Sequence, residues 1–405
     1  MKIFNIFVII LTLFANISSK NLYNTININR NNLLFAVEPK IIVDNVSDFH
    51  TDLQYKYITD PYPENIYRYA HGDTDLSRPK GNILDFSGDV RDSLSYVIQY
   101  SPSENFYENE TTIIKNLDKK KYVLKNLKLN ETIYYRGAVN EEELKNSTIH
   151  KLTVNSVPPR NLDIPKVDNA RDIGGYKTYL VKDGIIKQGL YYRTAALADV
   201  EDEGKYIISK ILGIKREINL IETNFDPNID GVSNNFIPMK DTDENNRFEE
   251  FDHAYKQVFN LMAEADKYPI LLHCAAGADR TGVMSFALLA LLGVETNDIK
   301  RDYAFTSFGV QGDRYIENSQ LLLWMDKLER YEGDTLAEKC KSWLISKGIK
   351  EIVLERIREI FIDGYKERKR LNNYELNKKI ESEVKIPEIQ VIENELLNNE
   401  IQLFK

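Results

Sequence analysis

One segment of the chain joins a strand-like run to a helix-like run through a short loop: Pro269-Ile-Leu-Leu-His-Cys-Ala-Ala-Gly-Ala-Asp-Arg-Thr-Gly-Val283. Residues 270–272 have the apolar composition of a buried strand. Residues 281–292 are almost continuously apolar and are followed by Gly293, which is typical of a buried helix and its end. The sequence therefore predicts a strand, a loop from Cys274 to Arg280, and a helix that begins at the end of this loop.

Such a loop is suited to binding phosphate. The backbone N–H groups of the loop and the helix dipole create a positive electrostatic potential at one point. The Arg280 guanidinium can bind two oxygens of a phosphate placed there. The same field favours a thiolate at Cys274, which would act as a nucleophile, and Thr281 could donate a hydroxyl to that sulfur. His273 is expected to hold the loop by hydrogen bonds. The predicted phosphate-binding residues are Ala275, Ala276, Gly277, Ala278, Asp279 and Arg280.

Length and composition limit the possible functions. The chain has 405 residues, enough for two domains, and its 42% hydrophobic share can form real cores. A net charge of −9 argues against broad binding to nucleic acid or to anionic membranes. Only two cysteines are present, so no disulfide framework is expected. The second, Cys340, lies in a helical pattern and is expected to be inert packing.

The two ends of the chain read as segments outside the folded domains. Residues 1–19 combine one basic residue, a short apolar core and small residues, which predicts a cleaved signal peptide and a secreted protein without stable membrane insertion. Residues 20–33 are polar and are expected to be a linker. Residues 366–405 are rich in charge and are expected to form a tail.

Residues 34–157 contain short strand-like runs separated by turn signals, which predicts a β-sandwich domain. An irregular cap on the catalytic half is the alternative. Residues 124–136 resemble the end of a fibronectin type III domain. The three histidines of this half, His50, His71 and His150, lack the spacing of metal ligands and are expected at the surface or in turns.

Residues 160–365 resemble the protein tyrosine phosphatase superfamily. The His-Cys-x5-Arg-Thr-Gly segment resembles its signature loop, and Asn169-Ala-Arg-Asp-Ile-Gly-Gly175 and Tyr192-Arg-Thr194 resemble segments of one branch. This branch contains the secreted bacterial and fungal tyrosine phosphatases related to the mycobacterial tyrosine/lipid phosphatase. The resemblance implies a parallel-sheet α/β domain with helices on both faces, and structural support of the site by Arg171, Asp172 and Arg193. It implies a closing pair of helices before residue 365.

The sequence offers several candidates for the general acid. Asp241 follows a strand-like run at about the spacing at which dual-specificity phosphatases place their acid. Asp243 is a rival on the same loop, and Asp279 is a third candidate because the branch places Asp beside the loop arginine. Asp226 resembles the acid loop of receptor-type phosphatases but is better explained by a turn.

These patterns predict an exported cysteine phosphatase that needs neither cofactor nor metal and acts on a phosphorylated peptide or small phosphate ester. The branch commonly has Lys where this chain has Ala278, which weakens an interpretation as a phosphoinositide phosphatase and favours phosphotyrosine. A phosphatase for inositol phosphates or phosphoinositides is the enzymatic alternative. A catalytically weak protein that binds phospho-ligands, or an adhesin built on the N-terminal domain, is the alternative from another class.

Overall fold

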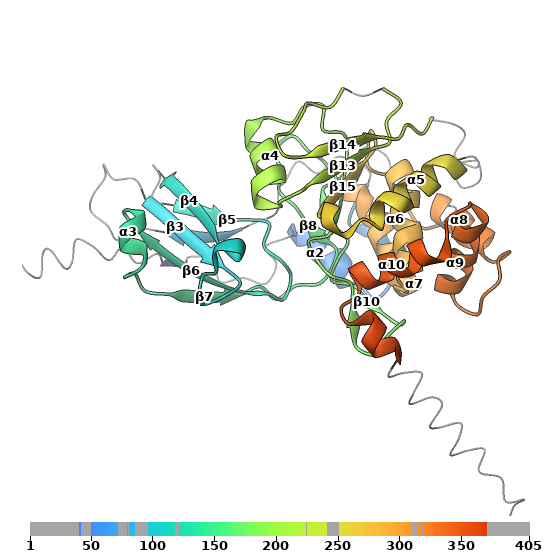
Figure 1. Cartoon of the computed structure of the whole chain (residues 1–405), viewed down its shortest axis with the longest axis horizontal. Helices are drawn as coiled ribbons and strands as arrows, with labels where there is room; N and C mark the ends of the chain where they lie inside the picture. The colour runs from blue at the N-terminus through green and yellow to red at the C-terminus, as the bar shows by residue number, and fades with distance from the viewer. Residues whose placement is uncertain are drawn as a thin grey trace, which may run out of the picture.

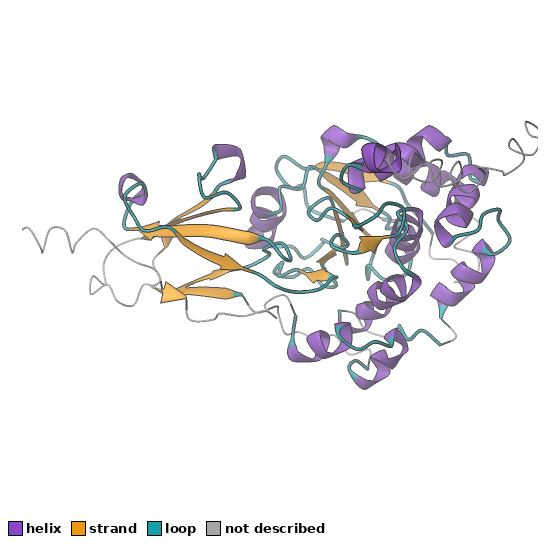
Figure 2. Ribbon diagram, turned by 90° about the horizontal axis from the view of Figure 1, so that it is seen from below, coloured by secondary structure: helices purple, strands orange, loops and turns teal. Residues whose placement is uncertain are grey.

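The computed structural model describes residues 40–41, 50–71, 79, 81–85, 96–117, 121–223, 225–240, 251–309, 314–317 and 319–370. A smaller, strand-rich half lies beside a larger half in which helices surround a sheet (Figures 1 and 2). The predicted signal peptide and the linker lie outside the described residues, as does the predicted tail from residue 371 onward. Within the described part of the chain, none of the helices combines the length and the apolar character needed to cross a membrane.

The larger half is built on a six-stranded sheet with the order β14-β13-β15-β12-β9-β8. The first four strands in this order run parallel, and the last two are antiparallel to their neighbours. The bounds are β8 Arg160–Asn161, β9 Arg171–Asp172, β12 Tyr191–Thr194, β13 Arg216–Asn219, β14 Ser233–Phe236 and β15 Ile270–His273. The predicted strand of residues 270–272 is therefore β15, and it lies between β13 and β12.

Alternate residues of β15 reach two different apolar clusters, as the two-residue repeat of a strand requires. Ile270 and Leu272 belong to the main core, whereas Leu271 packs in a second cluster on the opposite face. The main core is formed with α5 Asp252–Met262, α6 Arg280–Leu291, α7 Thr296–Phe305, α8 Gln320–Leu328, α9 Leu336–Ser346 and α10 Glu351–Phe361. The other face is covered by α4 Asp202–Tyr206 and the π-helical turn Ile207–Ile211. This half is a mixed α/β fold, and α9 and α10 are the predicted closing pair.

The smaller half contains two antiparallel sheets with the orders β1-β2-β5 and β4-β3-β6-β7. Side chains from both sheets share one apolar cluster that includes Leu84, Ile98, Leu124 and Tyr135. The bounds are β1 Lys40–Ile41, β2 Asn82–Asp85, β3 Tyr96–Ser101, β4 Thr112–Leu117, β5 Lys121–Leu124, β6 Thr132–Ala138 and β7 His150–Thr153, with a short helix α3 at Glu141–Leu144. The resemblance of this half to fibronectin type III domains stays a prediction.

The two halves are joined by hydrogen bonds from the turn between β5 and β6. The Asn126 side chain donates to the carbonyl of Asp163 at 3.0 Å and accepts from the amide of the same residue at 2.8 Å. The Gln188 side chain likewise accepts from the Leu129 amide at 2.8 Å and donates to its carbonyl at 2.9 Å. Paired donor and acceptor contacts of this kind fix an orientation and not only a distance.

Residues 50–71 do not join the two small sheets, although they fall within the predicted sandwich domain. They form helix α2 Asp52–Ile58 and a 3-10 turn at Pro63–Arg68. Tyr57 and Ile66 are fully buried in the main core of the larger half, where the Tyr57 ring lies 5.9 Å from that of Phe308. This segment is therefore part of the larger half in space, because its apolar side chains pack there.

The expectation of a surface position for His50 was wrong. His50 is fully buried, its Nε2 lies 2.7 Å from the carbonyl oxygen of Pro159, and burial lowers its pKa to about 4. His150 is partly buried and stacks on Tyr135, whereas His71 is exposed. His50 thus fastens the segment 50–71 to the start of the larger half.

Candidate active site

The loop of residues 274–280, called the Cys274 loop from here on, lies at the carboxyl end of β15. Cys274 follows the last residue of this strand, and Arg280 is the first residue of α6. The Cys274 side chain is free and buried, with 2% of its surface exposed. Open parallel sheets place their ligand sites at this edge, where a helix N-terminus also points its amides.

The carbonyl groups of the Cys274 loop are turned outward and held by the surrounding chain. Three consecutive carbonyls accept hydrogen bonds: that of Ala275 from the Ala196 amide at 3.0 Å, that of Ala276 from the Asn169 side chain at 3.1 Å, and that of Gly277 from Arg193 at 2.8 Å. In a planar trans peptide the carbonyl and the following N–H point in opposite directions. The amides of residues 276–278 therefore face inward, where they form a nest for an anion.

Gly277 is required by the close approach of the loop to β12. Its φ is +65°, in the left-handed region that favours glycine. A Cβ at this position would lie 2.2 Å from the carbonyl oxygen of Thr194 and 2.5 Å from its carbonyl carbon. A side chain would therefore push the loop off the strand that supports it.

Arg280 is held beneath the ends of two neighbouring strands. Its Nη1 donates to the Met239 carbonyl at 3.0 Å and to the Leu220 carbonyl at 3.5 Å, and 7% of the residue is exposed. The guanidinium is thus positioned by backbone groups that follow β13 and β14. The predicted hydrogen bond from Thr281 to the sulfur is not formed, because the Thr281 hydroxyl is buried without a partner in the described part of the chain.

Two arginines and one aspartate form what we call the arginine cluster, on the β12 side of the Cys274 loop. Arg171 Nε donates to Asp302 Oδ1 at 2.8 Å, and Arg193 Nη1 donates to Asp302 Oδ2 at 2.6 Å. All three side chains are at most 2% exposed. Burial alone would raise the pKa of Asp302, but the two arginines beside it hold that pKa below its usual value. Arg193 then connects this cluster to the loop through the carbonyl of Gly277.

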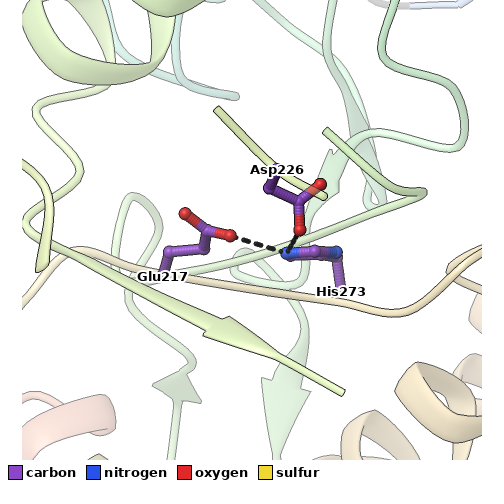
Figure 3. Close-up of side chains that lie close together, drawn as sticks. All are labelled: Glu217, Asp226 and His273. Carbon is purple, nitrogen blue, oxygen red and sulfur yellow. Dashed lines mark hydrogen bonds and ion pairs between the residues drawn. The ribbon is translucent and has the colours of Figure 1, made fainter. Parts of the chain in front are cut away.

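His273 and two carboxylates form the acid cluster on the β13 side (Figure 3). The His273 Nε2 lies 3.0 Å from Glu217 Oε1 and 3.5 Å from Asp226 Oδ2. Burial raises the pKa of Asp226; His273 acts against this shift and Glu217 adds to it. The ligand atoms lie within 4.8 Å of one another, close enough to surround a metal ion. Asp226, however, also accepts from the Leu197 amide at 2.9 Å and from Asn219, so we assign the cluster to hydrogen bonding.

Comparison with known proteins supports a phosphatase assignment for this part of the chain. Residues 162–361 match the model of the tyrosine phosphatase family. These residues are therefore similar to the tyrosine phosphatase family. The match supports the assignment of residues 162–361 to the phosphatase hydrolases.

Individual relatives are similar over limited lengths. A tyrosine-protein phosphatase of Nostoc commune is 40% identical over 58 residues, which are 14% of this chain and 20% of that protein. The chain thus matches about a fifth of the length of this curated relative. Among solved structures, the catalytic domain of the PP-IP phosphatase Siw14 from S. cerevisiae is 17% identical, with 38% of this chain and 91% of that chain covered and a TM-score of 0.28. P. aeruginosa TpbA is 14% identical, with coverages of 43% and 97% and a TM-score of 0.28.

Only two of the four aspartates considered as general acids lie among the described residues. Asp241 and Asp243 lie outside the described residues. Asp279 accepts hydrogen bonds from Arg314, from Nε at 3.2 Å on one oxygen and from Nη2 at 3.1 Å on the other. Asp226 is turned toward His273 in the acid cluster, so its carboxylate lies behind the Cys274 loop.

The predicted supporting residues act in two separate groups. Arg171 and Arg193 meet at Asp302, whereas Asp172 bonds the amides of Gly174 and Gly189 at 2.8 and 2.6 Å. Asp172 also pairs with Arg160 at 3.0 Å. Asp172 therefore braces the backbone at these two glycines, whereas Arg171 lies on the opposite face, because adjacent residues of a strand point to opposite faces.

Proposed function

We propose that the chain is an exported, cysteine-dependent phosphatase that hydrolyses phosphate monoesters, with phosphotyrosine as the preferred substrate. The observation that carries this proposal is the arrangement of Cys274 at the head of an amide nest, with Arg280 at the start of the following helix. A nucleophilic sulfur and a dianion site thus come together in one loop. The family match supports the same class of reaction.

The first step transfers the phosphoryl group to sulfur. The Cys274 thiolate attacks phosphorus, an S–P bond forms and the bond from phosphorus to the leaving oxygen breaks. Arg280 and the inward amides of residues 276–278 hold the three oxygens of the transferring group. A proton from Asp241 neutralises the leaving oxygen.

The second step returns the enzyme to its starting state. Water attacks phosphorus, the S–P bond breaks, and inorganic phosphate and the thiolate are released. The Asp241 carboxylate takes a proton from the attacking water and is again ready to act as an acid. The substrate, water and these side chains supply all the atoms and protons that the two steps require.

The choice of Asp241 as the acid is supported by the contact of Arg280 with the carbonyl of Met239. Met239 is two residues before Asp241, and consecutive Cα atoms are about 3.8 Å apart, so the chain enters this acidic loop at the site. Asp279 is the rival. Both of its oxygens are engaged by Arg314, which leaves it less suited to donating a proton.

The N-terminal half is proposed to be a β-sandwich that acts in spacing or adhesion. The apolar cluster shared by its two sheets supports the sandwich, and its contacts with residues 160–189 support a fixed orientation toward the phosphatase domain. Export rests on the character of residues 1–19.

The proposal is tested by hydrolysis assays on residues 20–405, kept reduced and free of metal. The substrates are a phosphotyrosine peptide, a phosphoserine peptide, a phosphoinositide and phytate. We expect the phosphotyrosine peptide to be hydrolysed fastest and Cys274→Ser to lose all measurable activity. Asp241→Asn should lower kcat by about 10²- to 10⁴-fold, as the loss of a general acid does.

Cys340→Ser is the matched control. Cys340 is fully buried, its thiol donates to the Ala287 carbonyl at 3.3 Å, and burial raises its pKa to about 12. Its loss should leave activity unchanged. Activity that survives in Cys274→Ser would refute the mechanism. Preference for phytate or the phosphoinositide would replace phosphotyrosine as the substrate, and a fall in kcat only in Asp279→Asn would reassign the acid.

A further inference from the structure

The arginine cluster carries more positive than negative charge. Arg171 and Arg193 are both cations, and the single Asp302 carboxylate lies between them at 2.8 and 2.6 Å. Their formal charges leave one positive charge uncompensated among side chains that are at most 2% exposed. Burial of an unbalanced charge is unfavourable, so its retention beside a reactive loop suggests a role in that loop.

Three other sets of charged side chains surround the loop. Asp279 and Arg314 form a neutral pair at the start of α6. Glu217, Asp226 and His273 lie on the β13 side, whereas Arg193 reaches the loop from β12. Arg280 lies beneath the ends of β13 and β14.

Arg193 brings the charge of the cluster to the loop. Its Nη2 donates to the Gly277 carbonyl at 2.8 Å and lies 3.5 Å from the Ala278 carbonyl. A cation at the oxygen end of a peptide polarises it, which makes the N–H at the other end a stronger donor. The amides concerned are those that face the anion nest.

We propose that the arginine cluster is an electrostatic part of the active site, in which Arg171, Arg193 and Asp302 are positioning residues that favour an anion in the Cys274 loop. The anions are the Cys274 thiolate in the free enzyme and the phosphoryl oxygens in the complex. The proposal rests on the proposed function, since it concerns the same loop. It goes beyond mechanical support, because the charge itself is required.

Four variants separate the charge from the hydrogen bonds that anchor the loop. Arg171→Met removes one cation and keeps the contact of Arg193 with Gly277. Arg193→Met removes a cation and this contact, whereas Arg193→Lys keeps the cation. Asn169→Ala removes the neighbouring anchor, the 3.1 Å bond to the Ala276 carbonyl, together with the hydrogen bond that the Asn169 side chain accepts from Arg171, without a change in formal charge.

The measurement is the rate of iodoacetamide labelling at Cys274 as a function of pH, followed by mass spectrometry of its peptide. Protection of Cys274 by tungstate, an analogue of phosphate, is measured in parallel. We expect Cys274 in Arg171→Met and in Arg193→Met to be labelled about tenfold more slowly at pH 6. We expect these variants to need about tenfold more tungstate for the same protection. A tenfold change corresponds to about 1.4 kcal/mol less stabilisation of the anion in the loop. Arg193→Lys and Asn169→Ala should stay within about threefold of the wild type.

Asp302→Asn is expected to change the rate of labelling in the opposite direction. It removes the only anion of the cluster, so labelling at pH 6 should become faster. Slower labelling in Asp302→Asn, or a wild-type profile in Arg171→Met, would overturn the proposal and leave the cluster as mechanical support. If Asp302→Asn does not fold, Arg171→Met remains decisive, because it leaves a neutral Arg193–Asp302 pair. Labelling and tungstate protection need no turnover, so absence of hydrolysis by the wild type would refute the proposed function without deciding this proposal.

Discussion

Two buried charge clusters flank strand β15, and they differ in sign, in the strand that carries them and in the face of the sheet on which they lie. The arginine cluster reaches β15 from β12, where Arg193 pairs in register with Leu272. The acid cluster reaches it from β13, where Glu217 pairs with Leu271. Leu272 belongs to the main core and Leu271 to the cluster on the opposite face, so the two charge clusters lie on opposite faces of the sheet.

The difference shows how one sheet can hold charges of opposite sign on its two faces, next to the same loop. The arginine cluster has two cations for one anion and bonds the loop directly through Arg193. The acid cluster bonds the side chain of His273, the residue before the nucleophile, and its carboxylates are satisfied by hydrogen-bond donors. The negative charge is thus kept behind the strand, while the positive charge is connected to the peptides of the loop.

Among the variants that test this comparison, Asp302→Ala is expected to lower the free energy of unfolding most. Two buried guanidinium groups would then face each other without a counter-charge, and breaking a buried pair in this way lowers the free energy of unfolding by about 3–5 kcal/mol. Urea unfolding measures this change. Asp326→Ala on the exposed side of α8 is the control and should change the free energy of unfolding by less than about 0.5 kcal/mol. A loss below about 1 kcal/mol for Asp302→Ala would show that the arginines find other partners.

A smaller effect is expected from Glu217→Gln in the acid cluster. The side chain is 3% exposed, and the variant replaces a charged acceptor of His273 by a neutral one. Loss of a hydrogen bond to a charged group costs about 1.5–3 kcal/mol, and Asp226 remains 3.5 Å from the same nitrogen to limit the damage. The same urea titration measures it. An effect as large as that of Asp302→Ala would mean that the two clusters do not differ in strength.

The smallest effect is a difference in pH dependence between the two clusters. The pKa of Asp226 is raised by burial, against the influence of His273, so its contribution to stability is present below the unfolded value of 3.8 and is lost as pH rises through the folded value. The pKa of Asp302 is lowered, because the arginines outweigh burial, so its contribution is present above 3.8 and is lost as pH falls through the folded value.

Unfolding of Asp226→Asn at pH 4 and pH 7 checks the first of these signs. The free energy of unfolding of the variant relative to wild type should rise with pH, because the variant lacks the unfavourable ionisation. Asp302→Asn should show the reverse trend, with a deficit that shrinks as the pH is lowered below 4. Parallel curves for wild type and both variants would contradict both assignments.

The parts of the site that are contiguous in sequence could be predicted, and those assembled from distant elements could not. The strand, Cys274, Arg280 and the helix form one segment, so their relation is visible in the order of residues. Arg193 was expected to support the site, but its partner Asp302 is 109 residues away, in a polar stretch of α7 that resembles a solvated helix face. No sequence feature predicted the contact of Glu217 with His273, because a single glutamate in a strand does not show which residue lies next to it in space.

The burial of Asp226 is a feature that the sequence pattern did not predict. The turn expected around Phe225-Asp-Pro227 hides a carboxylate whose side chain is 1% exposed and contacts His273. Burial of one polar side chain in a loop depends on the strands beneath it, and a single sequence does not contain that information. The strands of residues 96–101, 132–138 and 150–153 fall in the region predicted to be strand-rich, because short strand-like runs between turn signals are a local feature of the sequence.

The helix and turn of residues 50–71 make the catalytic unit discontinuous along the chain. The part of its core beside Phe305 and Phe308 is supplied by Tyr57, Ile66 and the ring of His50, which lie between β1 and β2 in sequence. A fragment cut at the prolines before Arg160 would keep every residue of the Cys274 loop and still lose this part of its core. The larger half is therefore completed by an upstream segment of the same chain, and a fragment that keeps this core intact has to include residues 50–71.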